Sequence, residues 1–185
     1  MKKNLSPKLL KHVGSIDMAT FRFCLFVEQN KNIFAENAQK SQYEALNGVF
    51  IKNIDKTFVK LFLKKGTDDY CQGNLPLLTK IEGYELLKKV DVSFLRNYPD
   101  KSAINIMALE IYGCMYQQGQ GAKGVMHANG SNNFFYSIDN YGKRRFVKLW
   151  YSKDVVFGYD GWCISVVDTN DCLDIGCRVF FSGQF

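Results

Sequence analysis

The chain has 185 residues, of which 46% are hydrophobic and 23% charged, and it carries a net charge of +6. These values are those of an ordinary globular protein and exclude a disordered or collagen-like chain. No stretch approaches the roughly 18 apolar residues of a membrane-spanning helix, and the length fits one domain over residues 1–185.

The first fifty residues predict helices. Ser6 followed by Pro7 is typical of a helix start, because serine caps the first free N–H groups and proline suits the first helical position. The helix that begins there is expected to contain His12. Two further helices are expected to begin at Asp17 or Thr20 and at Asn32.

Residues 50–65 form the clearest amphipathic pattern in the chain. Apolar residues recur at helical spacing and Gly66 ends the pattern. We therefore expect a helix with one solvated basic face that has at most a steering role for acidic partners. Lysines recur on that face at every fourth position: Lys52, Lys56, Lys60 and Lys64.

The rest of the chain changes from helical to β-rich patterns. Residues 75–98 predict two short helices broken at Gly83, and residues 104–112 fit either a strand or a helix. Four strands are then expected between turn signals. Together these patterns predict an α+β fold in which N-terminal helices (about 1–100) pack against a C-terminal antiparallel sheet (about 103–185). The four strands are expected at 134–138, 146–151, 162–167 and 178–181.

No cofactor or metal ion is expected. The six cysteines form no Cys-x-x-Cys pair, which a zinc site usually needs. Gly119–Gly124 matches a dinucleotide fingerprint in its letters alone, since no strand-to-helix turn surrounds it. The acidic segment Asp168–Asp174 lacks the glycine and glutamate of a calcium-binding loop.

The chain has two histidines, and His127 has the more suggestive surroundings. A turn at residues 129–133 is expected to fold the next strand back, so that His127 and Asp139 lie near the same end of a hairpin. The carboxylate would then bind one imidazole nitrogen and leave the other to face a nucleophile. The alternative is that Asp139 merely shapes the turn it begins and that His127 is a surface residue.

The segment around His127 resembles the YopT/AvrPphB-type effector cysteine peptidases. In that family a His-Ala strand is followed by an aromatic pair, an aspartate-containing turn and an aromatic-rich strand. The glycine-rich approach at 121–126 is similar as well. The matching residues are His127-Ala128, Phe134-Phe135, Asp139-Asn140-Tyr141-Gly142 and Phe146.

The resemblance implies a papain-like fold with a Cys24–His127–Asp139 triad. Cys24 precedes His127 by 103 residues (127 − 24) and is expected at a helix start, which favours a reactive thiolate. In this triad Cys24 attacks an acyl carbon, His127 is the base and Asp139 orients it. The family usually has Gly-x-Cys, whereas this chain has Arg22-Phe23-Cys24, and a buried structural cysteine is the alternative.

The same resemblance implies a secreted bacterial effector, a toxin-like thiol protease that acts on a host protein. It would be soluble in the bacterial cytoplasm and reach the host cytoplasm without a cleaved signal peptide. Expected partners are a protein substrate and weakly an anionic membrane surface, without nucleic acid, and the oligomeric state is not predicted. The alternatives are a glutamine deamidase with the same triad and a non-catalytic binding module such as an inhibitor, immunity or phage structural protein.

Overall fold

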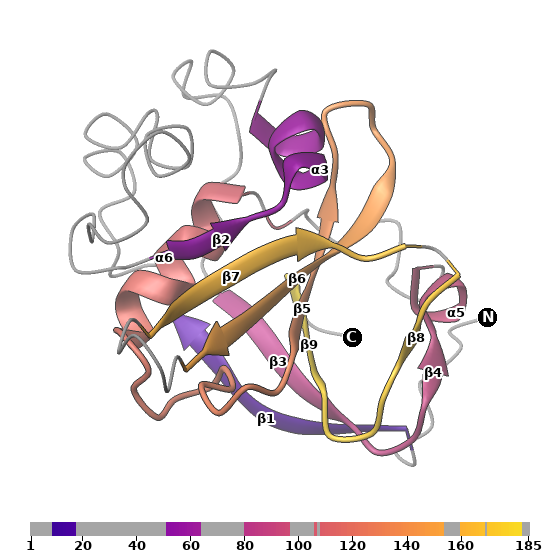
Figure 1. The fold of residues 1–185 in the computed structure, drawn as a ribbon. Helices are drawn as coiled ribbons and strands as arrows, with labels where there is room; N and C mark the ends of the chain where they lie inside the picture. The colour runs from indigo at the N-terminus through magenta and orange to yellow at the C-terminus, as the bar shows by residue number, and fades with distance from the viewer. Residues whose placement is uncertain are drawn as a thin grey trace.

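A seven-stranded sheet organises the computed structural model, which describes residues 9–17, 51–63, 80–96, 106, 108–153, 160–168 and 170–182 (Figure 1). The strands are β1 (Leu10–Asp17), β2 (Ile51–Ile54), β3 (Lys80–Leu86), β5 (Asn133–Ile138), β6 (Arg144–Ser152), β7 (Gly161–Val166) and β9 (Arg178–Ser182). Their order across the sheet is β1-β3-β9-β5-β6-β7-β2. The α+β class is therefore confirmed, with strands from both halves of the chain in one sheet.

The expectation of a purely antiparallel sheet is wrong. The strand β5 pairs in parallel with β9, and β2 pairs in parallel with β7, while the other neighbours are antiparallel. Both parallel pairs join strands that are distant in sequence, so they need long connections that turn signals do not reveal. The four strands expected in the C-terminal part are confirmed as β5, β6, β7 and β9.

Two segments that predicted helices form strands instead. His12 lies on β1, where it pairs with Tyr84 of β3. Gly83 lies inside β3 rather than at a break between helices. A Cβ atom at Gly83 would lie 2.8 Å from the ring of Phe180 and 3.0 Å from Val125. Close packing above the sheet therefore accounts for this glycine.

The amphipathic segment at 50–65 is helical only after its first residues. The strand β2 ends at Ile54, and the helix α3 (Lys56–Phe58) continues into a π-helical segment, η1 (Val59–Leu63). Asp55 caps this helix, because its Oδ1 accepts the N–H of Thr57 at 2.7 Å. The expected lysine row is thus divided: Lys52 lies on β2, Lys56 and Lys60 lie on the helices, and Lys64 lies outside the described residues.

Apolar side chains cover both faces of the sheet. One face packs against the helix α6 (Ala108–Gln118), so residues 108–112, which fitted either a strand or a helix, are helical. The other face packs against the helix α5 (Val92–Arg96) and the small ribbon of β4 (Val90–Asp91) and β8 (Cys172–Leu173). On β9, Phe180 stacks on Phe135 at 4.6 Å on the first face, whereas Phe181 meets Phe146 at 6.1 Å on the second. The strand β9 is thus buried on both sides.

Candidate functional site

The backbone of His127 is fixed at the beginning of β5 by one buried amide. Oδ1 of Asn133 accepts the N–H of His127 at 2.7 Å, and Nδ2 of Asn133 donates to the carbonyl of His127 at 3.0 Å. The same Nδ2 donates to the carbonyl of Leu149 on β6 at 3.2 Å. Because Asn133 is fully buried, these bonds satisfy a polar group that would otherwise destabilise the core.

The imidazole of His127 is oriented by a backbone carbonyl. Its Nε2 lies 2.9 Å from the oxygen of Gly176, in the turn between β8 and β9. A carbonyl only accepts hydrogen bonds, so Nε2 carries the proton in the neutral ring and Nδ1 is the basic nitrogen. Burial lowers the pKa of His127 below its ordinary value, although the bond to Gly176 opposes this effect. The ring is thus held as a neutral base.

A glycine-rich loop leads from α6 to His127 and is fixed from two sides. Gln118, the last residue of α6, accepts the N–H of Met126 at 2.8 Å and donates to the carbonyl of Met126 at 2.9 Å. Nη1 of Arg178 donates to the carbonyls of Val125 at 2.6 Å and Gly124 at 3.1 Å. The loop follows a helix and precedes a strand, so it lacks the strand-to-helix order of a dinucleotide site.

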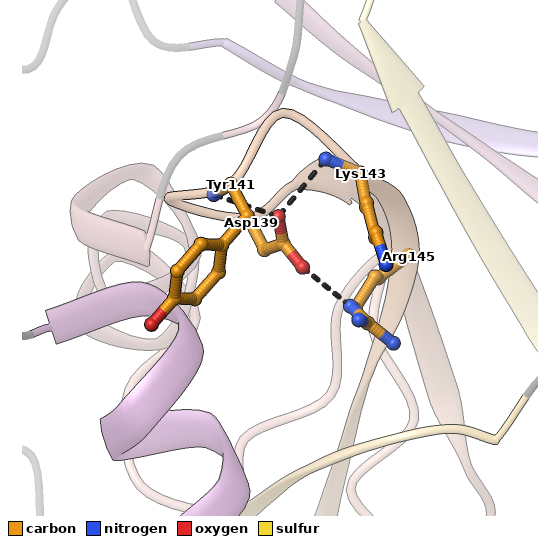
Figure 2. A network of polar contacts seen from close by, with 4 residues as sticks. All are labelled: Asp139, Tyr141, Lys143 and Arg145. Carbon is orange, nitrogen blue, oxygen red and sulfur yellow. Dashed lines mark hydrogen bonds and ion pairs between the residues drawn. The ribbon is translucent and has the colours of Figure 1, made fainter.

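Asp139 is committed to the turn between β5 and β6 (Figure 2). Its Oδ1 accepts the N–H groups of Tyr141 and Lys143, both at 2.9 Å, and its Oδ2 accepts Nε of Arg145 at 2.6 Å. Burial alone would raise the pKa of Asp139, but the hydrogen bonds from Arg145, Lys143 and Tyr141 outweigh it and lower the pKa. These contacts are those of the turn-shaping alternative.

The structure does not bring His127 and Asp139 together, because the hairpin expected between them does not form. Residues 119–132 form no strand, and β5 pairs with β6 and β9 instead. His127 therefore lies at the beginning of β5 and Asp139 follows its end. Six extended residues span about 20 Å, which is far beyond hydrogen-bonding distance.

The proposed nucleophile Cys24 lies outside the described residues, as does Cys71. Each of the four described cysteines has a raised pKa. Burial raises the pKa of Cys114 and Cys177, and raises that of Cys163 to about 11. Cys172 is exposed, and its hydrogen bond to Asp91 raises its pKa. None of these four thiols is thus held in the ionised form that nucleophilic catalysis requires.

A carboxylate–imidazole pair does occur, but at the other histidine, His12. Oε2 of Glu82 lies 2.8 Å from Nε2 of His12, and its Oε1 lies 2.7 Å from Nζ of Lys80. Burial alone would raise the pKa of Glu82, but the bonds to Lys80 and His12 lower it. The sequence gives no signal for this pair, because 70 residues separate His12 from Glu82.

Compared with known families, curated proteins and solved structures, the chain shows no significant match. Within the described ranges, no group of three or more histidine, cysteine, aspartate or glutamate side chains is arranged to hold a metal ion. The helices described here are all too short or too polar to cross a membrane.

Proposed function

We propose that the protein is a cysteine hydrolase in which His127 is the general base and Cys24 the nucleophile. The observation that carries this proposal is the state of His127, whose Nε2 is bound to the Gly176 carbonyl and whose pKa burial lowers. An imidazole that is neutral near physiological pH, with a fixed tautomer, suits proton abstraction from a thiol.

The choice of Cys24 rests on two arguments. The four described cysteines have raised pKa values, which leaves Cys24 and Cys71 as candidates. The resemblance to the YopT/AvrPphB-type peptidases favours Cys24, since that family places its nucleophile near the start of an N-terminal helix. The same resemblance supports a papain-like arrangement and a host protein as the substrate of a secreted effector.

The proposed reaction proceeds through a thioester. His127 accepts the thiol proton at Nδ1, and the Cys24 thiolate attacks the carbon of an amide. As the carbon–nitrogen bond breaks, the amine leaves with the proton from His127. Water then attacks the thioester carbon, His127 accepts its proton and returns it to the sulfur, and the acid is released. The backbone N–H of Cys24 would stabilise part of the oxyanion charge.

The orienting role moves from Asp139 to the carbonyl of Gly176. Asp139 is occupied by Arg145 and by two backbone N–H groups, so it has no hydrogen bond to offer a distant imidazole. A carbonyl fixes the tautomer as a carboxylate would, but it adds no negative charge beside the ring. We therefore expect a base that is oriented by hydrogen bonding with little electrostatic assistance.

The decisive experiment follows alkylation of each cysteine by iodoacetamide as a function of pH, with mass mapping of the modified peptides. We expect Cys24 to react first, with an apparent pKa well below about 8.5, and to react more slowly in a His127→Ala variant. A Cys172→Ser variant is the matched control, because among the four described cysteines it removes the exposed thiol and leaves the buried ones. First reaction at Cys163 or Cys114, or no effect of His127→Ala, contradicts the proposal.

The mass of the product separates the two catalytic alternatives. A protease cleaves its substrate, whereas a glutamine deamidase leaves it intact and heavier by about one mass unit, because an amide nitrogen is exchanged for oxygen through the same thioester. The non-catalytic binding module is favoured by the commitment of Asp139 to its turn. That function predicts six thiols of ordinary or low reactivity and no effect of His127→Ala on any of them.

A further inference from the structure

The side chain of His12 is exposed, whereas the carboxylate that orients it is buried. His12 lies on β1 with 53% of its side chain exposed, and Glu82 of the neighbouring strand β3 has only 7% of its side chain exposed. Nε2 of His12 lies 2.8 Å from Oε2 of Glu82. The ring of Tyr84 meets the imidazole in a T-shaped arrangement, with 5.4 Å between the ring centroids. Two side chains of β3 therefore orient an imidazole that solvent can reach.

The basic nitrogen of the neutral His12 ring is Nδ1. A carboxylate only accepts hydrogen bonds, so the proton of the neutral ring lies on Nε2 and the lone pair lies on Nδ1. Within the described part of the chain, Nδ1 of His12 forms no hydrogen bond. The neutral ring therefore has an oriented lone pair that is available for a bond to an electrophile.

The charges beside His12 suit a ring that becomes positive when it reacts. An imidazole that forms a new bond through Nδ1 and keeps its proton on Nε2 becomes a cation. The carboxylate of Glu82 stabilises such a cation through the hydrogen bond to Nε2. Nζ of Lys80, which is half exposed, lies 2.7 Å from Oε1 of the same carboxylate. Lys80 thus offsets the negative charge that would otherwise repel an anionic reactant.

We propose that His12 is a phosphoryl-acceptor site, at which Nδ1 takes a phosphoryl group from a donor of the phosphoramidate class. Nδ1 attacks the phosphorus atom as the phosphorus–nitrogen bond of the donor breaks. The electron pair of that bond leaves with the donor nitrogen, which is already protonated and departs as a neutral amine. The product ring carries the phosphoryl group on Nδ1, the proton on Nε2 and a positive charge beside Glu82. One phosphorus–nitrogen bond replaces another, so atoms and charge balance without a further reactant.

His127 provides the comparison within the same chain. Its Nε2 is bonded to the uncharged carbonyl of Gly176, which adds no negative charge beside the ring. Burial and the positive charge of Arg178 both disfavour a cationic ring at this position. We therefore expect His127 to accept a phosphoryl group more slowly than His12. The inference is independent of the proposed hydrolase, because neither Cys24 nor His127 takes part in the transfer.

The test incubates the whole chain with inorganic phosphoramidate and follows phosphohistidine by phosphorus NMR. Mass mapping at alkaline pH, where N-phosphorylated imidazole survives, identifies the modified residue. We expect phosphorylation at Nδ1 of His12, at a rate at least about ten-fold above that at His127, since a hydrogen bond to a charged group accounts for a factor of this size. The His12→Gln variant should lose this modification. No uptake by the wild-type protein, uptake at Nε2, or equal rates at the two histidines overturns the proposal.

The role of the carboxylate is tested by a matched pair of variants. Glu82→Gln is expected to slow phosphorylation of His12 roughly ten- to a hundred-fold, because a neutral amide does not stabilise the cationic ring. Glu85→Gln is the control, because Glu85 lies on the same strand but opposite Lys11, and it should leave the rate at His12 unchanged. Equal rates in the two variants overturn the proposal. Thermal melting checks the fold, and the comparison of His12 with His127 in the wild-type protein decides the question if Glu82→Gln does not fold.

Discussion

The two histidines of the chain are held by opposite kinds of partner. His12 is 53% exposed and bonds an ionised carboxylate, Glu82, which is buried and shared with Lys80. His127 is partly buried and bonds the uncharged carbonyl of Gly176. Burial favours the neutral ring and is the largest cause of the lowered pKa of His127, and the positive charge of Arg178 lowers this pKa further. His127 is therefore held as a neutral ring with a fixed tautomer.

The supports of the two histidines also differ in extent. His12, on β1, is fixed by two side chains of the adjacent strand β3: Glu82 bonds its Nε2, and the ring of Tyr84 lies 5.4 Å from its own. His127 is fixed through its backbone by Asn133, and the loop before it is fixed by Gln118 and Arg178. Damage to a buried backbone clamp leaves several polar groups unsatisfied, whereas damage to a half-exposed pair exposes its remaining groups to water.

The largest effect is expected for Asn133→Ala. The change removes the partners of the N–H of His127 and the carbonyls of His127 and Leu149 in a fully buried position. At about 1–3 kcal/mol for each of the three unsatisfied groups, we expect a loss of at least about 3 kcal/mol in the free energy of unfolding, measured by urea denaturation.

The matched control for this loss is Asn129→Ala. Asn129 is exposed, and its Oδ1 accepts the N–H of Ser131 at 3.1 Å, so we expect a loss below about 1 kcal/mol. Similar losses in the two variants would show that Asn133 does not clamp His127.

The β-rich part of the chain was predictable because its signals are local. The strands β5, β6, β7 and β9 are apolar runs between turn residues, and each was expected within one or two residues of its bounds. Their neighbours in the sheet were not predictable, because the parallel pairs join segments that are distant in sequence.

The first strands were mistaken for helices for two physical reasons. In β1 a bulge between His12 and Gly14 interrupts the two-residue alternation, so Leu10, Val13 and Ile16 recur every third residue as on a helix. In β3 the buried position of Glu82 breaks the apolar pattern that would indicate a strand. Asp139 does not bond His127 because its carboxylate bonds Arg145 instead. Arg145 lies on β6, the strand that pairs with β5, so nothing in the sequence indicated this contact.

The next effect in size is expected for Glu82→Gln at the His12 pair. The neutral amide loses charged hydrogen bonds to Lys80 and His12, so we expect a loss of about 2 kcal/mol at pH 7 in urea denaturation. The folded pKa of Glu82 is lowered, so its stabilisation is present above its unfolded pKa and disappears as the pH falls through the folded value. The variant should therefore lose less stability on acidification than the wild-type protein does.

Lys89→Gln is a suitable control for Glu82→Gln, because Lys89 forms an exposed ion pair with Asp174 at 3.5 Å. Pairs of this kind contribute about 0–1 kcal/mol. Unchanged acid sensitivity in Glu82→Gln would mean that other carboxylates account for the acid sensitivity of the protein.

A smaller effect is expected for Asp139→Asn. Asparagine can still accept the N–H groups of the turn but loses the charge beside Arg145, so we expect a loss of about 1–2 kcal/mol in the free energy of unfolding. The Arg145→Gln variant should lose a similar amount, and the double variant little more, because both changes remove the same ion pair. The NMR titration of His127 should not change, and a clear shift would restore Asp139 as a partner of that ring.

The smallest effect concerns the protonation of His127 itself. Its folded pKa is lowered, so the unfolded chain binds more protons in the interval between the folded value and the unfolded value of about 6.5. Stability should therefore decline as the pH falls from about 6.5 to the folded pKa, and it should change no further through this group below that value. Urea denaturation over this interval, compared between the wild-type protein and His127→Gln, isolates the contribution. An NMR titration of the His127 ring gives its pKa directly, with His12→Gln used to assign the two signals. A pKa at or above about 6.5 would show that the ring of His127 is not held in its neutral form. The proposed hydrolase would then lose its main support.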